Sequence, residues 1–164
     1  MIATIDGWAG AGKTTLASFL EKSFESELSV STIHMDDLYD GWGDPLGEKL
    51  THKLMEIASA HILKIPYRTT RYDWHKNNPG EEFEIPNSDL LILEGVGSGQ
   101  RSIRDKVSMK FWVNIDPHLG LDRVLERDGQ EIKTQMQVFL QMSSEHFAKE
   151  GTANAADYHL NGAR

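Results

Sequence analysis

The residues best suited to chemistry lie near the start of the chain, where residues 7–14 read Gly-Trp-Ala-Gly-Ala-Gly-Lys-Thr. This spacing matches the pattern G-x-x-x-x-G-K-[ST] of a phosphate-binding loop. In such a loop the glycines let backbone N–H groups converge on phosphate oxygens, and the helix that follows contributes the positive end of its dipole. Lys13 would reach the β- and γ-phosphates, and the Thr14 hydroxyl would hold Mg²⁺. The pattern predicts that a nucleoside triphosphate such as ATP binds at Gly7, Trp8, Ala9, Gly10, Ala11, Gly12, Lys13, Thr14 and Thr15.

The segments on either side of this loop have the character that the pattern requires. Residues 1–6 read as a short buried strand, and residues 15–22 read as a helix with Leu16, Phe19 and Leu20 on one face. A strand, a glycine-rich loop and a helix N-terminus in this order form the arrangement that binds phosphate.

Two acidic residues follow a second expected strand, which spans residues 29–34. A carboxylate at Asp36 is placed to accept a proton from an acceptor hydroxyl, and the adjacent Asp37 is an alternative for that role. Both could instead cap the turn that follows, which Asp does well.

Glu94 ends an apolar run that we expect to be a strand buried on both faces, residues 89–94. An acid in that position is costly without a partner, and Mg²⁺ at the neighbouring phosphate loop is the natural one. The alternative is a carboxylate that caps the loop of residues 95–99.

A pair of arginines, Arg123 and Arg127, lies four residues apart on a helix that we expect to begin at Pro117. Both arginines fall on one helix face, where they could close over a transferring phosphoryl group. The alternative is ordinary surface ion pairing with the neighbouring acidic residues.

Strands and helices alternate along the chain. Further strands are expected at 109–116 and 158–160, and further helices at 48–63 and 132–148, whereas residues 66–86 are polar and show no clear period. This alternation predicts a three-layer α/β fold with a parallel sheet between helices on both faces. A chain of 164 residues fits a single domain, residues 1–164.

The overall composition excludes several classes of protein. A net charge of −8 argues against non-specific nucleic-acid binding, and the absence of cysteine excludes disulfides and thiolate metal sites. No apolar run approaches the roughly 20 residues of a membrane span. We therefore expect a cytoplasmic protein that binds neither nucleic acid nor membrane.

A set of segments in order carries a resemblance to a known family. The segments are residues 7–15, 34–39 (His-Met-Asp-Asp-Leu-Tyr), 71–74 (Arg-Tyr-Asp-Trp), 93–95 (Leu-Glu-Gly), 103–106, 109–113 and 123–128. Together they resemble the uridine kinase family of P-loop kinases, with phosphoribulokinase and pantothenate kinase as wider relatives. The similarity runs from residue 1 to about residue 128.

This resemblance implies a P-loop NTPase fold with a five-stranded sheet in the order 2-3-1-4-5. It implies that Asp36 is the catalytic base and that Arg123 and Arg127 begin a lid at about residues 123–135. It places contacts to the substrate at Asp36, Tyr39, Tyr72, Asp73, His75 and Arg104.

The function expected from these residues is that of an ATP- and Mg²⁺-dependent small-molecule kinase, whose acceptor hydroxyl belongs to a nucleoside or a related metabolite. Two alternatives remain open. The chain could be a nucleotide-binding module or slow ATPase that acts through a protein partner, without need of Asp36. It could also phosphorylate a sugar acid or other non-aromatic acceptor, in which case Trp42 and Trp74 would not be needed for stacking on a planar ring.

Overall fold

The chain folds around a five-stranded parallel sheet, and the computed structural model describes residues 1–74 and 76–162. The sheet strands are β1 (Ile2–Gly7), β2 (Val30–His34), β5 (Leu90–Glu94), β6 (Met109–Asn114) and β7 (Tyr158–Asn161). Their spatial order is β2-β5-β1-β6-β7, and every neighbouring pair is parallel. Numbered within the sheet, this order is 2-3-1-4-5, so the expected fold and strand order are confirmed.

The strand register brings chemical groups to one edge of the sheet. Ile5 lies opposite Glu94, and His34 lies opposite the same Glu94 from the other side. Because parallel strands end at a common edge, the phosphate loop after β1 and the acidic segment after β2 both begin beside Glu94.

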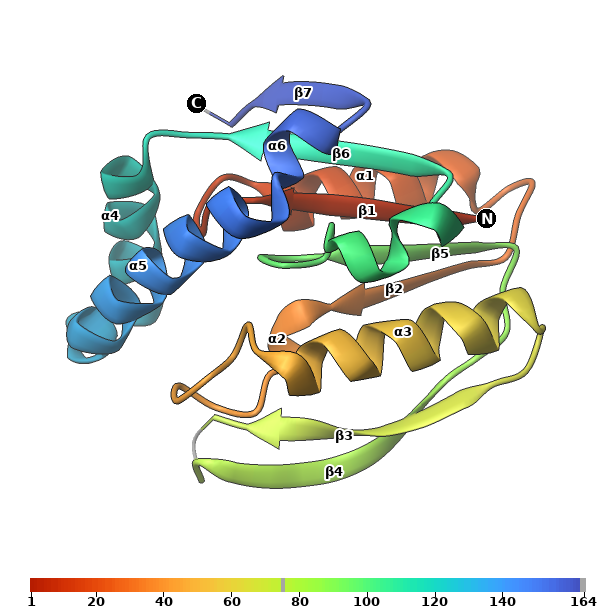
Figure 1. Ribbon diagram of the computed structural model, residues 1–164, viewed down its shortest axis with the longest axis horizontal. Helices are drawn as coiled ribbons and strands as arrows, with labels where there is room; N and C mark the ends of the chain where they lie inside the picture. Colours follow the sequence, from red (N-terminus) through yellow and green to blue (C-terminus); the bar gives the residue numbers. More distant parts are fainter. Residues whose placement is uncertain (75, 163–164) are drawn as a thin grey trace.

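Helices cover both faces of the sheet, as Figure 1 shows. Alternate residues of β5 point to opposite faces: Leu91 and Leu93 belong to one hydrophobic core, Leu90 and Ile92 to the other. The first core packs against α3 (Glu48–Ile62) and α5 (Lys133–Glu150), and the second against α1 (Lys13–Phe24). This double burial explains why β5 is apolar throughout.

The apolar face of α1 differs from the expected one. Phe19 is 65% exposed, whereas Ala17 is buried and Leu16, Leu20 and Phe24 are partly buried against the sheet. The helix begins at Lys13, and at 3.6 residues per turn Ala17, Leu20 and Phe24 share its sheet-facing side. Phe19 lies on the opposite side, so its assignment to the apolar face was wrong.

Residues 66–86 hold a hairpin where the sequence indicated no regular structure. Strands β3 (Tyr67–Asp73) and β4 (Asn78–Ile85) pair antiparallel, outside the main sheet. In Figure 1 they lie beside α3, near the short helix α2 (Met35–Leu38). A register shift between Thr70 and Tyr72 breaks the two-residue period, and most of the β4 side chains are exposed. The hairpin therefore lacks the alternation by which a half-buried strand is recognised.

The remaining elements are short helical segments and one longer helix that lie around the sheet. They are η1 (Arg101–Lys106), α4 (Pro117–Asp128), η2 (Gln130–Ile132) and α6 (Thr152–Ala155). Asp116 caps α4 by accepting hydrogen bonds from the backbone N–H groups of His118 and Leu119. Within the described part of the chain, no helix has the length and apolar character needed to cross a membrane.

Candidate active site

The phosphate loop connects the end of β1 to the first turn of α1 and packs closely on α4. Gly10 has φ 73°, and a Cβ at this position would lie 2.2 Å from the carbonyl oxygen of Gly120. The same holds in reverse, since a Cβ on Gly120 would lie 2.2 Å from the carbonyl oxygen of Ala9. The loop and α4 therefore touch backbone to backbone, which only glycine permits at these two positions.

Lys13 lies inside the curve of this loop. It is only 8% exposed, and its Nζ donates a hydrogen bond to the carbonyl oxygen of Trp8 at 2.8 Å. Burial lowers the pKa of Lys13, while the negative charges of Asp6, Glu94 and Asp36 oppose that shift. The ammonium group thus lies where the pattern places the cation for the phosphates.

Thr14 and Glu94 meet at the edge of the sheet. The Thr14 hydroxyl donates to Glu94 Oε1 at 3.1 Å, and Glu94 is 5% exposed. In the described residues no cluster of three or more His, Cys, Asp or Glu side chains could hold a metal ion. Mg²⁺ in nucleotide sites commonly takes one or two protein oxygens, with phosphates and water completing its shell. The two adjacent oxygens of Thr14 and Glu94 fit that requirement.

His34 also contacts Glu94, a contact that sequence reasoning missed. Its Nδ1 lies 2.5 Å from Glu94 Oε1, and this hydrogen bond raises the pKa of His34. The sequence held one indication of this contact, which is the position of the two residues. His34 is the last residue of β2, and Glu94 is the last residue of the neighbouring β5.

Asp36 and Asp37 have different surroundings. Arg71 holds Asp37 with Nε on Oδ1 at 2.8 Å and Nη2 on Oδ2 at 3.2 Å. Asp36 is an exposed residue by its surface area, yet the protein around its carboxyl group removes enough water that desolvation raises its pKa. The charges of Lys13, Glu94 and Arg127 act on it as well. Asp36 thus belongs to the charged group around the phosphate loop, and Asp37 to an ion pair with the hairpin.

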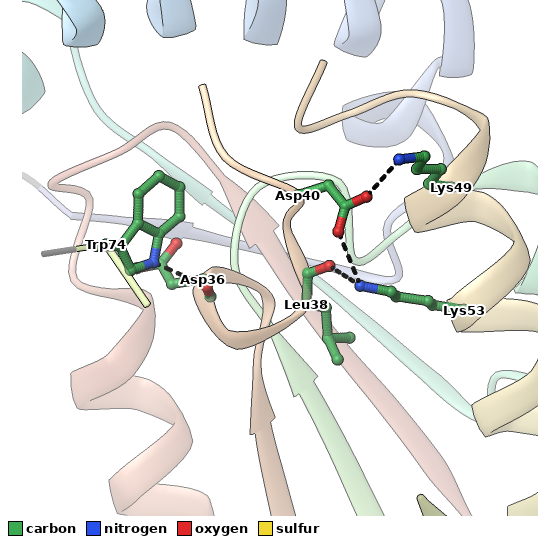
Figure 2. A network of polar contacts seen from close by, with 6 residues as sticks. All are labelled: Asp36, Leu38, Asp40, Lys49, Lys53 and Trp74. Carbon is green, nitrogen blue, oxygen red and sulfur yellow. Dashed lines mark hydrogen bonds and ion pairs between the residues drawn. The ribbon is translucent and has the colours of Figure 1, made fainter. Parts of the chain in front are cut away.

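The turn that carries Asp36 is held from two sides (Figure 2). From the hairpin, the indole Nε1 of Trp74 donates to the carbonyl oxygen of Asp36 at 3.1 Å. From α3, Lys53 Nζ donates to the carbonyl oxygen of Leu38 at 2.8 Å. Asp40 accepts from Lys49 at 2.7 Å and from Lys53 at 3.5 Å, which ties the next residues to α3.

The two arginines of α4 have distinct environments. Arg123 Nη1 donates to the carbonyl oxygen of Gly162 at 2.7 Å and to that of Gly10 at 3.4 Å, so it joins α4 to the phosphate loop and to the residue after β7. Arg127 forms an ion pair with Asp128 at 2.6 Å, and its charge also acts on Lys13 and Asp36. Arg127 is therefore the more exposed of the two cations, whereas Arg123 is tied to backbone carbonyl groups of two other segments.

Comparison with known proteins finds small-molecule kinases among the proteins that this chain resembles. No family model matches the chain. A uridine kinase from Lactobacillus johnsonii is 26% identical over 152 residues, which is 80% of this chain and 69% of that protein. A cytidylate kinase from Methanococcoides burtonii is 25% identical over 162 residues, covering 97% of this chain and 81% of its own length. The solved structure of a possible uridine kinase from Bacillus stearothermophilus shares the fold, with a TM-score of 0.68 at 20% identity and coverage of 98% and 88%.

The chain is a P-loop kinase that is similar to uridine kinases. It is thus a phosphotransferase, and in open parallel sheets ligands bind at the carboxyl edge, where the charged groups described above lie.

Several of the residues that were expected to contact the substrate have partners within the fold. Tyr39 is 3% exposed, and its hydroxyl donates to the carbonyl oxygen of Val96 at 2.7 Å. Tyr72 donates to Asn77 Oδ1 at 2.8 Å. Asp73 accepts from the backbone N–H of Lys76 and pairs with its ammonium group at 3.1 Å.

Arg104 donates to the carbonyl oxygens of Gly99 at 2.9 Å and Glu150 at 2.7 Å. It thereby joins the loop after β5 to the end of α5, and burial lowers its pKa. The expected site at His75 lies outside the described residues.

Five aromatic side chains gather beside Asp36 and form what we call the aromatic cluster: Tyr39, Trp42, Tyr72, Trp74 and Phe139. The rings of Trp42 and Trp74 meet edge to face, with centroids 5.0 Å apart.

A hollow of about 310 Å³ lies under the hairpin, between Tyr72 and Lys53. Another, of about 500 Å³, lies between Trp42 and the first turns of α5. Members of the aromatic cluster thus line both hollows, Tyr39 and Tyr72 the first and Trp42 the second.

Asp6 is a second residue that sequence reasoning missed as a participant in the site. It is the residue before Gly7, it is 1% exposed, and its carboxylate accepts hydrogen bonds from the N–H groups of Gly7, Gly97 and Gly99. An acid inside a buried strand, directly before the phosphate loop, was the signal that could have identified it.

Proposed function

We propose that this chain is an ATP- and Mg²⁺-dependent kinase that transfers the γ-phosphate of ATP to a hydroxyl group of a small molecule. A nucleoside or a related metabolite is the proposed acceptor class. The observation that supports this function most strongly is the meeting of Lys13, the Thr14–Glu94 pair and Asp36 at one edge of the sheet. The relatives named uridine kinase and cytidylate kinase support the acceptor class.

Each of these groups has a role in phosphoryl transfer. The loop amides and Lys13 would bind the triphosphate, and Thr14 and Glu94 would hold Mg²⁺, which would neutralise charge on the phosphate oxygens. Asp36 orients the acceptor hydroxyl and takes its proton as the new O–P bond forms and the bond to ADP breaks. Arg127 stabilises the charge that spreads over the transferring group, while Arg123 keeps α4 against the loop.

The acceptor would enter between the Asp36 turn and the hairpin. Trp74 belongs to the hairpin and binds the backbone of Asp36, so the recognition surface and the proposed base form one unit. Tyr72 and Asp73 lie on the same hairpin, and the edges of Trp42 and Trp74 offer an apolar border for a planar ring. Residues 123–135 would act as the lid of a single domain that spans residues 1–164.

The function is tested by measuring ADP release from Mg·ATP with a panel of nucleosides, sugars, sugar acids and vitamins. One class of acceptor should stimulate ADP release, and Lys13→Ala and Asp36→Asn should each abolish that stimulation. Asp36→Asn should leave ATP affinity nearly unchanged, because the base acts on the acceptor.

Asp37→Asn is the matched control, since it breaks the pair with Arg71 and leaves the charged group around Lys13 intact. A full-rate Asp36→Asn enzyme would contradict the assignment of the base. If ATP binds but no acceptor stimulates turnover, a nucleotide-binding module that acts through a protein partner becomes the better description.

A further inference from the structure

The carboxylate of Asp6 connects two loops that are distant in the sequence. Its Oδ1 accepts from the N–H of Gly7 at 2.8 Å and from that of Gly97 at 3.0 Å, and its Oδ2 accepts from Gly99 at 2.9 Å. Gly7 begins the phosphate loop, whereas Gly97 and Gly99 belong to the loop that follows β5. One buried side chain thus binds the backbone of both loops.

Each of these two loops adjoins one residue of the Thr14–Glu94 pair in the sequence. The phosphate loop leads from Gly7 to Thr14, and the second loop begins directly after Glu94. Every residue from Gly95 to Gln100 is buried, and Gly95 N donates to Ile5 O at 3.0 Å. A shift of either loop would therefore move one of the two oxygens that meet at 3.1 Å.

We propose that Asp6 is a positioning residue that holds the phosphate loop and the loop after Glu94 in register, so that Thr14 and Glu94 lie at the spacing that a shared Mg²⁺ requires. This inference rests on the proposed function for its Mg²⁺ part. The joining of the two loops depends only on the hydrogen bonds of Asp6.

The choice of an acid at this place has a physical reason. The acid has a cost, because a carboxylate loses more free energy on burial than a neutral side chain does. Burial raises the pKa of Asp6 to about 6, even though three N–H groups favour the charged form. Hydrogen bonds to a charged acceptor are roughly twice as strong as those to a neutral one. The stronger bonds suit a link that must hold two loops in place while phosphates bind beside it.

The charged groups around Asp6 favour its carboxylate. Lys13 from α1 lowers the pKa of Asp6, against the effect of burial, and Arg104 from η1 is also within electrostatic reach. Tyr39, directly after α2, is a further titratable group on which the charge of Asp6 acts. Burial is the main cause that keeps the pKa of Tyr39 well above its ordinary value.

Asp6→Asn provides a sharp test because the two side chains have the same shape. An Asn oxygen in place of Oδ1 can still accept from Gly7 and Gly97, but its NH₂ group then faces the N–H of Gly99. By titration calorimetry at pH 7.5 we expect affinity for Mg·ATP to fall about tenfold, as is typical when a group supporting a metal site is lost. Affinity for ATP without Mg²⁺ should change much less. Amide hydrogen exchange at Gly99, followed by NMR, should become faster.

Asp89→Asn is the matched control. Asp89 likewise accepts hydrogen bonds from a backbone N–H and a hydroxyl, those of Ser29, but it does so at the amino ends of β2 and β5. This variant should leave both ATP affinities unchanged. An Asp6→Asn protein with wild-type Mg²⁺ dependence and wild-type exchange at Gly99 would overturn the inference and leave the proposed function intact. A wild-type protein that fails to bind Mg·ATP would instead overturn the proposed function, while the exchange measurement still tests Asp6.

A measurement on the unmutated protein covers the case in which Asp6→Asn does not fold. The amide resonances of Gly97 and Gly99 should follow one titration with a midpoint near the pKa of about 6, because the group that titrates is their acceptor. The folded-state pKa lies above the ordinary 3.8, so the folded chain binds this proton more tightly than the unfolded chain does. Protonation of Asp6 should therefore not lower the melting temperature between pH 6 and 4. Amide resonances of Gly97 and Gly99 that shift with two different midpoints, or that do not shift at all before the chain unfolds in acid, would overturn the inference.

Discussion

The hydroxyl of Thr14 donates a hydrogen bond to the carboxylate of Glu94 across 3.1 Å, joining the first turn of α1 to the end of β5. The two residues are 80 positions apart, and parallel pairing of β1 with β5 brings them together. The same Glu94 oxygen contacts His34. A single buried carboxylate oxygen is thus the point where three segments of the site converge.

Loss of either partner of this pair should weaken Mg²⁺-dependent nucleotide binding. We expect Glu94→Gln to lower affinity for Mg·ATP by about 10–100-fold, since a neutral amide replaces a charged ligand oxygen. Thr14→Ala should have a similar effect, and Thr14→Ser should retain most of the affinity because the hydroxyl remains. Calorimetric titration with and without Mg²⁺ measures the effect. Equal losses in both conditions would argue against a metal role for the pair.

The two arginines of α4 should separate into different roles. Arg127→Ala should reduce turnover by about 10³-fold or more if Arg127 stabilises the transferring phosphoryl group, with little change in melting temperature. Arg123→Ala should instead lower stability by about 1–2 kcal/mol, because the carbonyl oxygens of Gly10 and Gly162 lose a charged donor. Turnover assays combined with thermal unfolding distinguish the two. An unfolding effect at Arg127 and none at Arg123 would reverse the assignment.

Gly120 should be as sensitive as a residue of the phosphate loop itself. A Cβ there would lie 2.2 Å from the carbonyl oxygen of Ala9, so Gly120→Ala must displace the loop or α4. Overpacking of this kind costs roughly 1–3 kcal/mol, and we also expect weaker ATP binding. Gly43→Ala is the control, since its Cβ would have no heavy atom within 4 Å. Chemical denaturation and calorimetry measure both effects, and an unaffected Gly120→Ala protein would show that the loop and α4 separate easily.

Stability should fall in mild acid because of His61 in α3. His61 is 7% exposed, and burial is the main cause that lowers its pKa. The folded chain therefore binds this proton less tightly than the unfolded chain, so the stability due to His61 is present above about pH 6.5 and is lost below it. His61→Gln should show a smaller drop in melting temperature from pH 7 to 5 than the wild type. His52→Gln, at an exposed position of the same helix, should behave as the wild type does.

The sequence alone determined the phosphate loop, the parallel sheet and the positions of Asp36 and Glu94 at strand ends. These features are encoded locally, because glycine spacing and a continuous apolar strand are properties of short segments. The order of the strands followed from the resemblance and is confirmed in the structure.

Only the tertiary structure decided what those residues touch. It placed Asp37 against Arg71, Arg123 on Gly10 and Gly162, and Asp6 beneath two loops. It also formed the hairpin of β3 and β4. The side chains of this hairpin are mostly polar and its register shifts, so the sequence shows no alternation of apolar and polar residues there. In each case the partner lies more than 30 residues away or the local pattern is broken, so no short segment specifies the contact. The pairing of distant strands brings these groups within hydrogen-bonding distance, and that pairing becomes visible only once the chain is folded.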